Sequence, residues 1–187
     1  STTAAFISDV TDGFDFGGAN DAVRESLPGA IRSVDIRRTE SNGQETRAAI
    51  LAAFANRQKL ITYIGHGSTG IWRGNVFTNL DAAALTNRDA LPVVVAMTCL
   101  NGFFHDTGNG ALAETLLKNP VGGAVAVWTS SGTTLPDSYG SMNVVLHREL
   151  LGGATLGEAH VRAKSQVANQ DLLKTWLLIG DPSMRLR

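Results

Sequence analysis

Short apolar runs that end in turns recur along the chain. Two of them, residues 60–67 (LITYIGHG) and 93–102 (VVVAMTCLNG), are continuously apolar until a glycine-containing turn closes them. Such a run is typical of a strand buried on both faces. Residues 31–36 instead alternate apolar and polar positions, which indicates an edge strand. Three more apolar runs complete the predicted strands, at residues 4–8, 122–128 and 176–179.

Segments with helical spacing of apolar residues separate these strands, and residues 45–56 carry the clearest stripe. The other predicted helices are residues 21–26 (capped by Asn20, ended by Leu27-Pro28-Gly29), 80–85, 111–118, 137–151 (capped by Asp137 or Ser138) and 155–169 (capped by Thr155). Polar stretches at residues 10–20, 68–79, 103–110 and 129–136 are predicted loops. Strands alternating with helices predict a three-layer α/β fold, with a mainly parallel sheet and helices on both faces.

Composition places the chain among globular proteins. Of its 187 residues, 43% are apolar and 18% charged, which predicts one domain over residues 1–187 with a sizeable core. A net charge of −1 gives no electrostatic case for binding nucleic acid or an anionic membrane. A single cysteine excludes an intrachain disulfide. No apolar run approaches the roughly 18 residues that predict a membrane span.

Reactive side chains follow the two longest apolar strands. His66 and Cys99 each lie just past the carboxyl end of such a strand, 33 residues apart (99 minus 66). Open parallel sheets build their sites at that edge. If the two strands are neighbours, the two residues can meet at that edge. This is the arrangement that a cysteine nucleophile and its base need. The alternatives are a buried apolar cysteine and a polar turn histidine between Gly65 and Gly67.

Three motifs resemble the gingipain family of cysteine peptidases, which belongs to the clan with the caspase-like fold. They are Tyr63-Ile64-Gly65-His66-Gly67-Ser68 with Trp72 downstream, Cys99-Leu100-Asn101-Gly102-Phe103-Phe104, and Gly180-Asp181-Pro182-Ser183-Met184. The resemblance covers residues 4–187 and implies a catalytic subdomain with a caspase-like fold. It implies that Cys99 is the nucleophile of an acyl-enzyme and that His66 is the general acid/base. It also implies an oxyanion hole formed by the backbone N–H groups of Gly67 and Cys99.

The resemblance further implies an acidic residue that orients the histidine, on the loop after the first strand. Asp9 and Asp12 both fit, and Asp9 is preferred because a strand end is held more rigidly than a loop tip. Either aspartate has an alternative interpretation as a turn or cap residue. Among the other histidines, His105 is a rival base. The remaining two, His147 and His160, fall in predicted helices as packing or surface residues.

Substrate choice is expected at the wall that follows the fifth strand, residues 128–136. Trp128, Thr129 and Ser130 are the candidate wall residues. The family resemblance implies a preference for cutting after Arg or Lys, paired with a carboxylate at the pocket floor. Asp137, Asp21 and Asp15 are available for that pairing. The wall is less aromatic than in gingipains, so the basic preference stays open.

No cofactor is required by this chemistry, and no residues have the spacing of a zinc site. The resemblance makes structural calcium an expectation for the Asp/Gly-rich loop over residues 9–20, which does not match an EF-hand. The expected partners are a protein or peptide substrate and a prosegment or amino-terminal subdomain, since the chain looks like an excised mature domain. The family's habit implies secretion, or attachment to the cell envelope, in a bacterium.

The leading hypothesis is therefore a cysteine endopeptidase with a Cys99/His66 dyad. One alternative is a transpeptidase that uses the same dyad and passes the acyl group to an amine. The other alternative is a silent interaction domain that has kept the fold.

Overall fold

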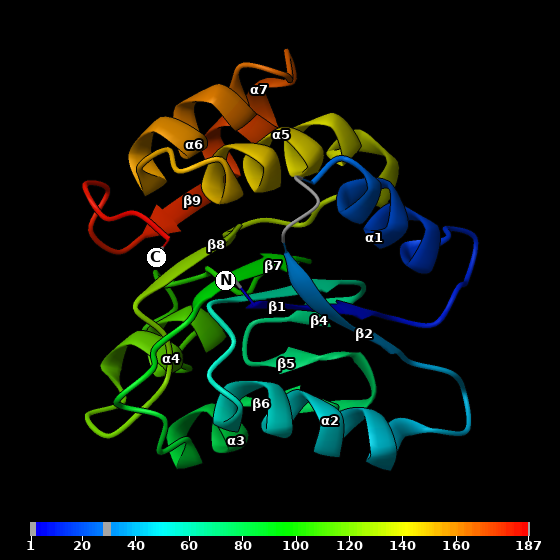
Figure 1. Ribbon diagram of the computed structural model, residues 1–187, viewed down its shortest axis with the longest axis vertical. Helices are drawn as coiled ribbons and strands as arrows, with labels where there is room; N and C mark the ends of the chain where they lie inside the picture. The colour runs from blue at the N-terminus through cyan, green and yellow to red at the C-terminus, as the bar shows by residue number, and fades with distance from the viewer. Residues whose placement is uncertain (1–2, 28–30, 187) are drawn as a thin grey trace.

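A six-stranded sheet forms the centre of the computed structural model, which describes residues 3–27 and 31–186 (Figure 1). Its strands are β1 (Thr3–Ser8), β2 (Arg32–Arg37), β3 (Leu60–Ile64), β7 (Val93–Met97), β8 (Ala126–Ser130) and β9 (Trp176–Ile179). They lie in the order β2-β1-β3-β7-β8-β9. The first five pair in parallel, while β9 pairs with β8 antiparallel. The predicted mainly parallel sheet is confirmed, with β2 at one edge.

Side chains that alternate along each strand divide between two hydrophobic cores. In β1, Ala4 and Phe6 belong to one core, and Ala5 and Ile7 belong to the other. Neighbouring side chains of a strand point to opposite faces, so a sheet covered on both sides needs apolar residues at almost every position. This is why β3, β7 and β8 are buried throughout and β1 is buried after its first residue, whereas most of the edge strand β2 is exposed.

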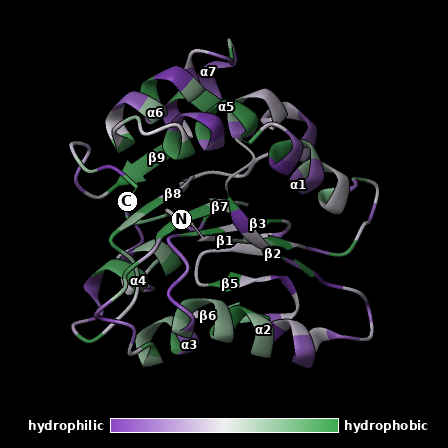
Figure 2. Ribbon diagram, viewed as in Figure 1, coloured by the Kyte–Doolittle hydropathy of each residue, from purple (hydrophilic) through white to green (hydrophobic). Residues whose placement is uncertain are grey.

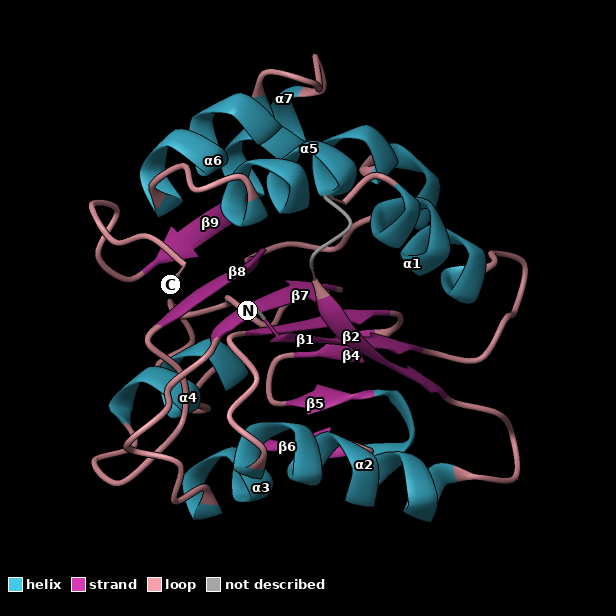
Figure 3. Ribbon diagram, in the orientation of Figure 1, coloured by secondary structure: helices cyan, strands magenta, loops and turns pink. Residues whose placement is uncertain are grey.

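Helices cover both faces of the sheet and give the predicted three layers (Figure 3). One face packs against α1 (Phe16–Glu25), α5 (Gly140–Leu151), α6 (Leu156–Lys164) and α7 (Gln170–Thr175). The other face packs against α2 (Gly43–Ala55), α3 (Asn79–Ala84) and α4 (Leu112–Lys118). Figure 2 shows the strands β7, β8 and β9 coloured as hydrophobic, with hydrophilic stretches on the flanking helices.

A small antiparallel sheet replaces the loop predicted over residues 68–79. It consists of β4 (Gly67–Ser68), β5 (Ile71–Trp72) and β6 (Phe77–Thr78). Trp72 stacks on Tyr63 of β3, with ring centroids 4.2 Å apart, and Phe77 stacks on Phe54 of α2. The two aromatic anchors therefore pack this segment against the main sheet and α2.

Three predicted helices have wrong boundaries, and the first is α1. The α1 helix begins at Phe16, because Asp15 accepts a hydrogen bond from the Gly18 N–H at 2.8 Å and caps it there. The predicted cap Asn20 instead lies buried inside the helix, where Nδ2 donates to the Ile7 carbonyl at 3.0 Å. The stop signal at Pro28–Gly29 lies outside the described residues.

The helix predicted over residues 155–169 is two helices. Thr155 caps α6 as expected, but α6 ends at Lys164 and Asn169 caps the separate α7. The 137–151 helix begins only at Gly140, after a short 3₁₀ turn over Pro136–Ser138. The described residues contain no helix long and apolar enough to cross a membrane.

Candidate active site

The turns that carry His66 and Cys99 follow two neighbouring strands, β3 and β7. Ile64 pairs with Met97, so the register offset between these strands is 33 residues (97 minus 64). The Gly65 N–H donates to the Met97 carbonyl at 3.3 Å and continues that register past the last pair. His66 and Cys99 have the same offset in sequence (99 minus 66), and each follows its strand by two residues. The expectation that these strands are neighbours is therefore confirmed.

Gly67 brings the two strand-end turns into contact. A Cβ atom on Gly67 would lie 2.6 Å from Thr98 Oγ1 and 2.8 Å from the Ile71 carbonyl oxygen. Real Cβ atoms do not approach other atoms so closely, so the turn after His66 needs a glycine to lie this near the residue before Cys99. On the other turn, Leu100 has a positive φ of 60°, a conformation that non-glycine residues seldom adopt. The chain thus bends sharply directly after Cys99.

The Cys99 thiol is half-buried against Thr134. The Thr134 N–H donates to Sγ at 3.4 Å, and Sγ lies 3.6 Å from the Thr134 carbonyl oxygen and 3.8 Å from its hydroxyl. A bond from the Leu100 N–H to the Gly132 carbonyl at 3.1 Å holds the two segments together. The loop after β8 therefore reaches the Cys99 thiol through Thr134, and its role as a substrate wall stays a prediction.

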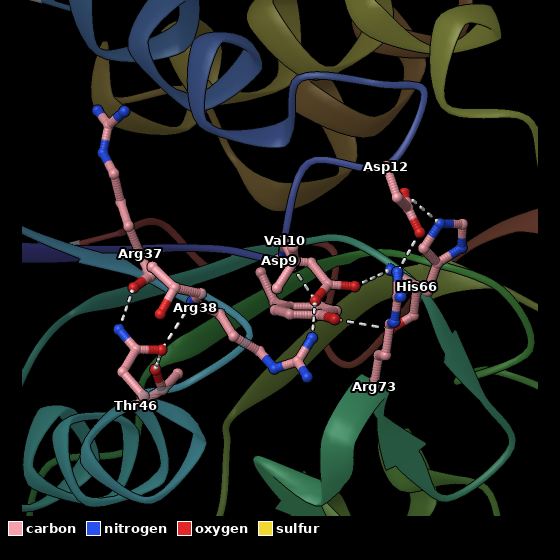
Figure 4. Close-up of polar contacts among 11 residues, drawn as sticks. Asp9, Val10, Asp12, Arg37, Arg38, Thr46, His66 and Arg73 are labelled. Atoms are coloured by element: carbon pink, nitrogen blue, oxygen red, sulfur yellow. Dashed lines mark hydrogen bonds and ion pairs between the residues drawn. The ribbon is translucent and has the colours of Figure 1, made fainter.

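His66 presents an exposed ring at the same edge (Figure 4). Its Nε2 lies 3.1 Å from Asp12 Oδ1, and the ring packs edge-on against Phe16 of α1 with centroids 5.3 Å apart. Because a carboxylate can only accept, Nε2 carries the proton in this contact. The Nδ1 atom is then left to exchange a proton with substrate.

Asp12 bridges His66 and Arg73, which pairs with its second oxygen (Figure 4). Partial desolvation on its own would raise the pKa of Asp12. The hydrogen bonds from Arg73 and His66 outweigh it, so the pKa lies below its usual value. Asp12 is therefore ionised at neutral pH, and Arg73 balances its charge.

Asp9, the preferred orienting residue, does not contact the His66 ring. Its fully buried carboxylate accepts from Arg38 Nη1 at 2.7 Å, from the His66 backbone N–H at 3.0 Å and from the Val10 N–H at 2.8 Å (Figure 4). The Tyr63 hydroxyl donates to the His66 carbonyl at 2.6 Å. These groups fix the main chain of His66. The His66 ring points away from the sheet and is contacted by Asp12, in the loop after β1.

The arginines of this network were missed by the sequence reasoning. Arg38 directly follows β2, so its position after a parallel strand was a usable signal that it lies at the same edge as Asp9. Arg73 follows β5, a two-residue strand without any detectable periodicity. No sequence signal pointed to its contact with Asp12.

The other histidines lie apart from this network. His105 packs on Phe103 in an exposed loop, with ring centroids 3.9 Å apart. His147 is fully buried between the Thr62 hydroxyl at 2.7 Å and the Asn143 carbonyl at 2.8 Å. His160 packs against the Trp128 ring. The expectation of packing roles for the last two is confirmed.

Most of the expected substrate-wall residues are placed elsewhere. Trp128, Thr129 and Ser130 are inside β8 with at most 1% of their surface exposed, so their side chains cannot line an open pocket. The reason is that β8 runs on to Ser130, two residues beyond its predicted end. Asp21 is paired with Arg37 at 2.6 Å on the surface of α1 and β2. Asp15 caps α1. Asp137 remains, exposed in the turn after Thr134.

The loop expected to bind calcium uses its carboxylates otherwise. Asp9 is paired with Arg38, Asp12 with Arg73, and Asp15 with the end of α1. Among the described residues, no group of three or more His, Cys, Asp and Glu side chains is placed to share a metal ion. Structural calcium stays a prediction, which a calcium titration followed by thermal unfolding would test.

Comparison with known proteins gives sequence relatives over most of the chain. A family model described as peptidase family C25 matches residues 2–187. Gingipain R2 of Porphyromonas gingivalis is 30% identical over 158 residues, which are 74% of this chain and 21% of that protein. Gingipain R1 of the same organism is also 30% identical over 158 residues, 74% of this chain and 15% of that protein. The chain thus spans about a fifth, or less, of these relatives.

Two solved structures share the fold. The complex of the pro- and mature domains of RgpB from Porphyromonas gingivalis matches with a TM-score of 0.83 at 22% identity, over 99% of this chain and 48% of that chain. The crystal structure of the Arg-specific cysteine proteinase gingipain R matches with a TM-score of 0.78 at 21% identity, over 99% of this chain and 47% of that chain. The three-layer fold is therefore caspase-like. The chain belongs to peptidase family C25, the gingipain family of cysteine peptidases.

Proposed function

We propose that the chain is a cysteine endopeptidase domain in which Cys99 is the nucleophile and His66 the general acid/base. The observation that supports the proposal is the 33-residue register offset between β3 and β7, because His66 and Cys99 follow these strands with the same offset. Membership in a cysteine peptidase family supports it.

The proposed reaction follows from the placement of these groups. Cys99 gives its thiol proton to His66 Nδ1. Its Sγ then attacks the scissile carbonyl carbon, and the C=O electron pair moves onto the oxygen. The N–H groups of Gly67 and Cys99 would bind that oxyanion, and each such donor is typically worth about 2.7–4 kcal/mol. When the tetrahedral species collapses, the C–N bond breaks and the amine leaves with a proton from His66 Nδ1. Water then gives a proton to His66 and hydrolyses the thioester.

Asp12 is proposed as the residue that orients His66. Its contact to Nε2 fixes the tautomer whose Nδ1 faces the substrate. Arg73 holds Asp12 in place and offsets its charge. Asp9 acts indirectly, because its carboxylate accepts a hydrogen bond from the backbone N–H of His66 and fixes the main chain there.

Cleavage after a basic residue is proposed on one observation and one relative. Asp137 is exposed on the turn that follows Thr134, which contacts the Cys99 thiol. Within residues 3–27 and 31–186 its carboxylate forms no ion pair, so it is available to a substrate Arg or Lys. The solved gingipain R is described as Arg specific.

Labelling of the single thiol tests this function. Peptidyl acyloxymethyl ketones with Arg, Lys, Asp or Asn at the terminal position would be applied to the wild type and to Cys99→Ala, and intact mass would be measured. One adduct that is lost in the variant, formed fastest with Arg or Lys, is the expected result. No adduct with any probe on a folded protein would contradict an active peptidase.

A latent or silent domain is the second candidate, because three atoms of Thr134 surround the thiol. Iodoacetamide separates the two: a thiol that reacts no faster than free cysteine would favour the silent domain. A transpeptidase would be shown instead by an added amine captured in the product.

Partners and location of the whole protein are proposals from its relatives. The RgpB structure is a complex of pro- and mature domains, so a prosegment is proposed as a partner here. Secretion from a bacterial cell is proposed on the same family basis. Detection of the mature protein in the culture medium of its host would test it.

A further inference from the structure

One buried side chain joins the turn that carries His66 to the turn that carries Cys99. Asn101 is 1% exposed. Its Nδ2 donates to the Ser68 carbonyl, and its Oδ1 accepts from Trp72 Nε1 at 2.8 Å. Ser68 lies two residues after His66, and Asn101 lies two residues after Cys99. The cross-link therefore has the same 33-residue offset (101 minus 68) as the strands below it.

This contact and the last backbone contact of the strands enclose the dyad. On the sheet side, the Gly65 N–H donates to the Met97 carbonyl. Beyond His66 and Cys99, where the backbones of the strands no longer pair, the side-chain amide of Asn101 bonds to the Ser68 carbonyl. His66 and Cys99 lie between these two cross-links, so their separation is fixed at both ends.

The start of α4 secures the same two turns. The Leu112 N–H donates to the Thr69 carbonyl at 2.8 Å, and the Ala113 N–H donates to the Asn101 carbonyl at 3.0 Å. These N–H groups belong to the first helical turn, where they have no partner within the helix. One rigid helix end therefore bonds both turns, and the Asn101 side chain completes the connection between them.

The orientation of the Asn101 amide follows from its partners. An indole N–H can only donate, so Oδ1 must face Trp72 and Nδ2 must face the Ser68 carbonyl. A carboxylate at position 101 would set a buried negative charge against that carbonyl. An alanine would leave both the Trp72 N–H and the Ser68 carbonyl without this partner.

We propose that Asn101 is a positioning residue that sets the separation of Cys99 and His66, with Trp72 holding its amide in orientation. The proposal rests on the function proposed above, because it concerns the geometry of that dyad. A misplacement of reacting groups by about 1 Å can cost on the order of a hundredfold in rate. Loss of the Asn101 side chain is therefore expected to lower kcat and to weaken the effect of the His66 imidazole on the reactivity of the Cys99 thiol.

Three variants test the proposal: Asn101→Ala, Trp72→Phe and Asn119→Ala. Trp72→Phe removes the indole N–H but keeps a ring on Tyr63. Asn119→Ala is the matched control, because Nδ2 of Asn119 also joins loops, bonding the Ala82 and Leu85 carbonyls at the α3–α4 contact. The measurements are kcat and KM on a peptide substrate, the rate of iodoacetamide alkylation against pH, and the thermal midpoint.

Asn101→Ala is expected to lower kcat about a hundredfold with little change in KM, and Trp72→Phe to lower it less. The alkylation profile of Asn101→Ala should move toward that of a free thiol, while Asn119→Ala keeps the wild-type profile. Wild-type kcat and profile in folded Asn101→Ala and Trp72→Phe would overturn the positioning role. So would equal losses of activity in the Asn119 control. A wild-type thiol that already behaves as free cysteine would instead overturn the proposed function.

Discussion

At the scale of single residues, two aspartates serve the same histidine differently. Asp12 is about one-third exposed and bonds the ring, whereas Asp9 is fully buried and bonds the main chain. An exposed carboxylate contributes little to folding, and a buried ion pair that loses one partner is costly. Substitution of Asp12 should therefore affect mainly activity, and substitution of Asp9 should affect mainly the stability of the fold.

Asp12→Asn is expected to lower kcat while leaving the free energy of unfolding nearly unchanged. An asparagine side chain is uncharged and can either donate or accept a hydrogen bond, so it does not hold the His66 proton on Nε2 as the carboxylate does. Urea unfolding and peptide turnover on the same preparation measure both quantities. Unchanged turnover would show that the Asp12 contact is not used in catalysis.

Asp9→Asn is expected to lower the free energy of unfolding by about 3–5 kcal/mol, because Arg38 then stays buried without its charge partner. Arg38 is only 10% exposed, so water does not screen the pair. Asp35→Asn is a suitable control, since that carboxylate pairs with Arg37 near the surface of β2. Equal losses from the two substitutions would contradict the assignment of a buried pair.

At the scale of elements, the turn from β3 to β4 has no room for a side chain at Gly67. Gly67→Ala is expected to lower both stability and turnover, because its Cβ would collide with Thr98 and the Ile71 carbonyl. Gly140→Ala is the control, because a Cβ at that helix start meets nothing within 4 Å. It should be neutral or slightly stabilising, by about 0.4–1 kcal/mol. A folded, fully active Gly67→Ala protein would show that the two turns lie further apart than described.

The α5 helix carries a histidine that makes stability depend on pH. Burial lowers the pKa of His147 to about 4, although its bond to the Asn143 carbonyl opposes the shift. The unfolded chain takes up this proton near pH 6.5, so acidification from pH 7 toward pH 4 favours unfolding. The loss from this residue should amount to about 3 kcal/mol.

Urea unfolding of the wild type and His147→Gln between pH 4 and 7 measures the effect. The variant should have a flatter curve, since glutamine has no proton to gain. His160→Gln gives a graded control, because burial also lowers the pKa of that half-buried ring and a smaller flattening is expected. Parallel curves for the wild type and His147→Gln would exclude His147 as the source.

At the scale of the whole molecule, the three tryptophans report both cores. Trp72 lies in the core under α2, α3 and α4, while Trp128 and Trp176 lie in the core under α1, α5, α6 and α7. If residues 1–187 fold as one domain, the two cores should unfold together because the same strands supply both. The Trp128→Phe/Trp176→Phe double variant reports one core through Trp72, and Trp72→Phe reports the other core. Their urea midpoints, measured by fluorescence, should agree once the change in unfolding free energy that each substitution causes is subtracted. Midpoints of the two variants that still differ after this correction would contradict a single domain.

Local pattern predicted the layers of this molecule and the two neighbouring strands that His66 and Cys99 follow. The strands β3 and β7 are continuously apolar, and their turns carry the reactive residues, so both could be read directly. The small sheet from β4 to β6 was missed because two-residue strands are too short to show a period. The start of α1 was missed because Gly17 and Gly18 favour a loop, although Asp15 caps a helix there.

The choice between Asp9 and Asp12 failed for a different reason. Sequence position gives the rigidity of a backbone, and this correctly favoured Asp9 as the better-held residue. It does not give the direction of a side chain beyond the end of a strand. Arg38 and Arg73 enter the site from β2 and β5, and such contacts depend on the assembled sheet.

The loop that leaves β8 contributes no reacting atom, although Thr134 lies on the thiol. In the proposed function, the register of β3 and β7 positions the reacting groups and this loop selects the substrate, so the two properties should be separable in engineering. Exchange of residues 131–136 for the loop of another peptidase should change which peptide probes label Cys99. The pH profile of alkylation should survive the exchange. If so, a change of substrate would need new residues in one surface segment only, with Cys99 and His66 kept.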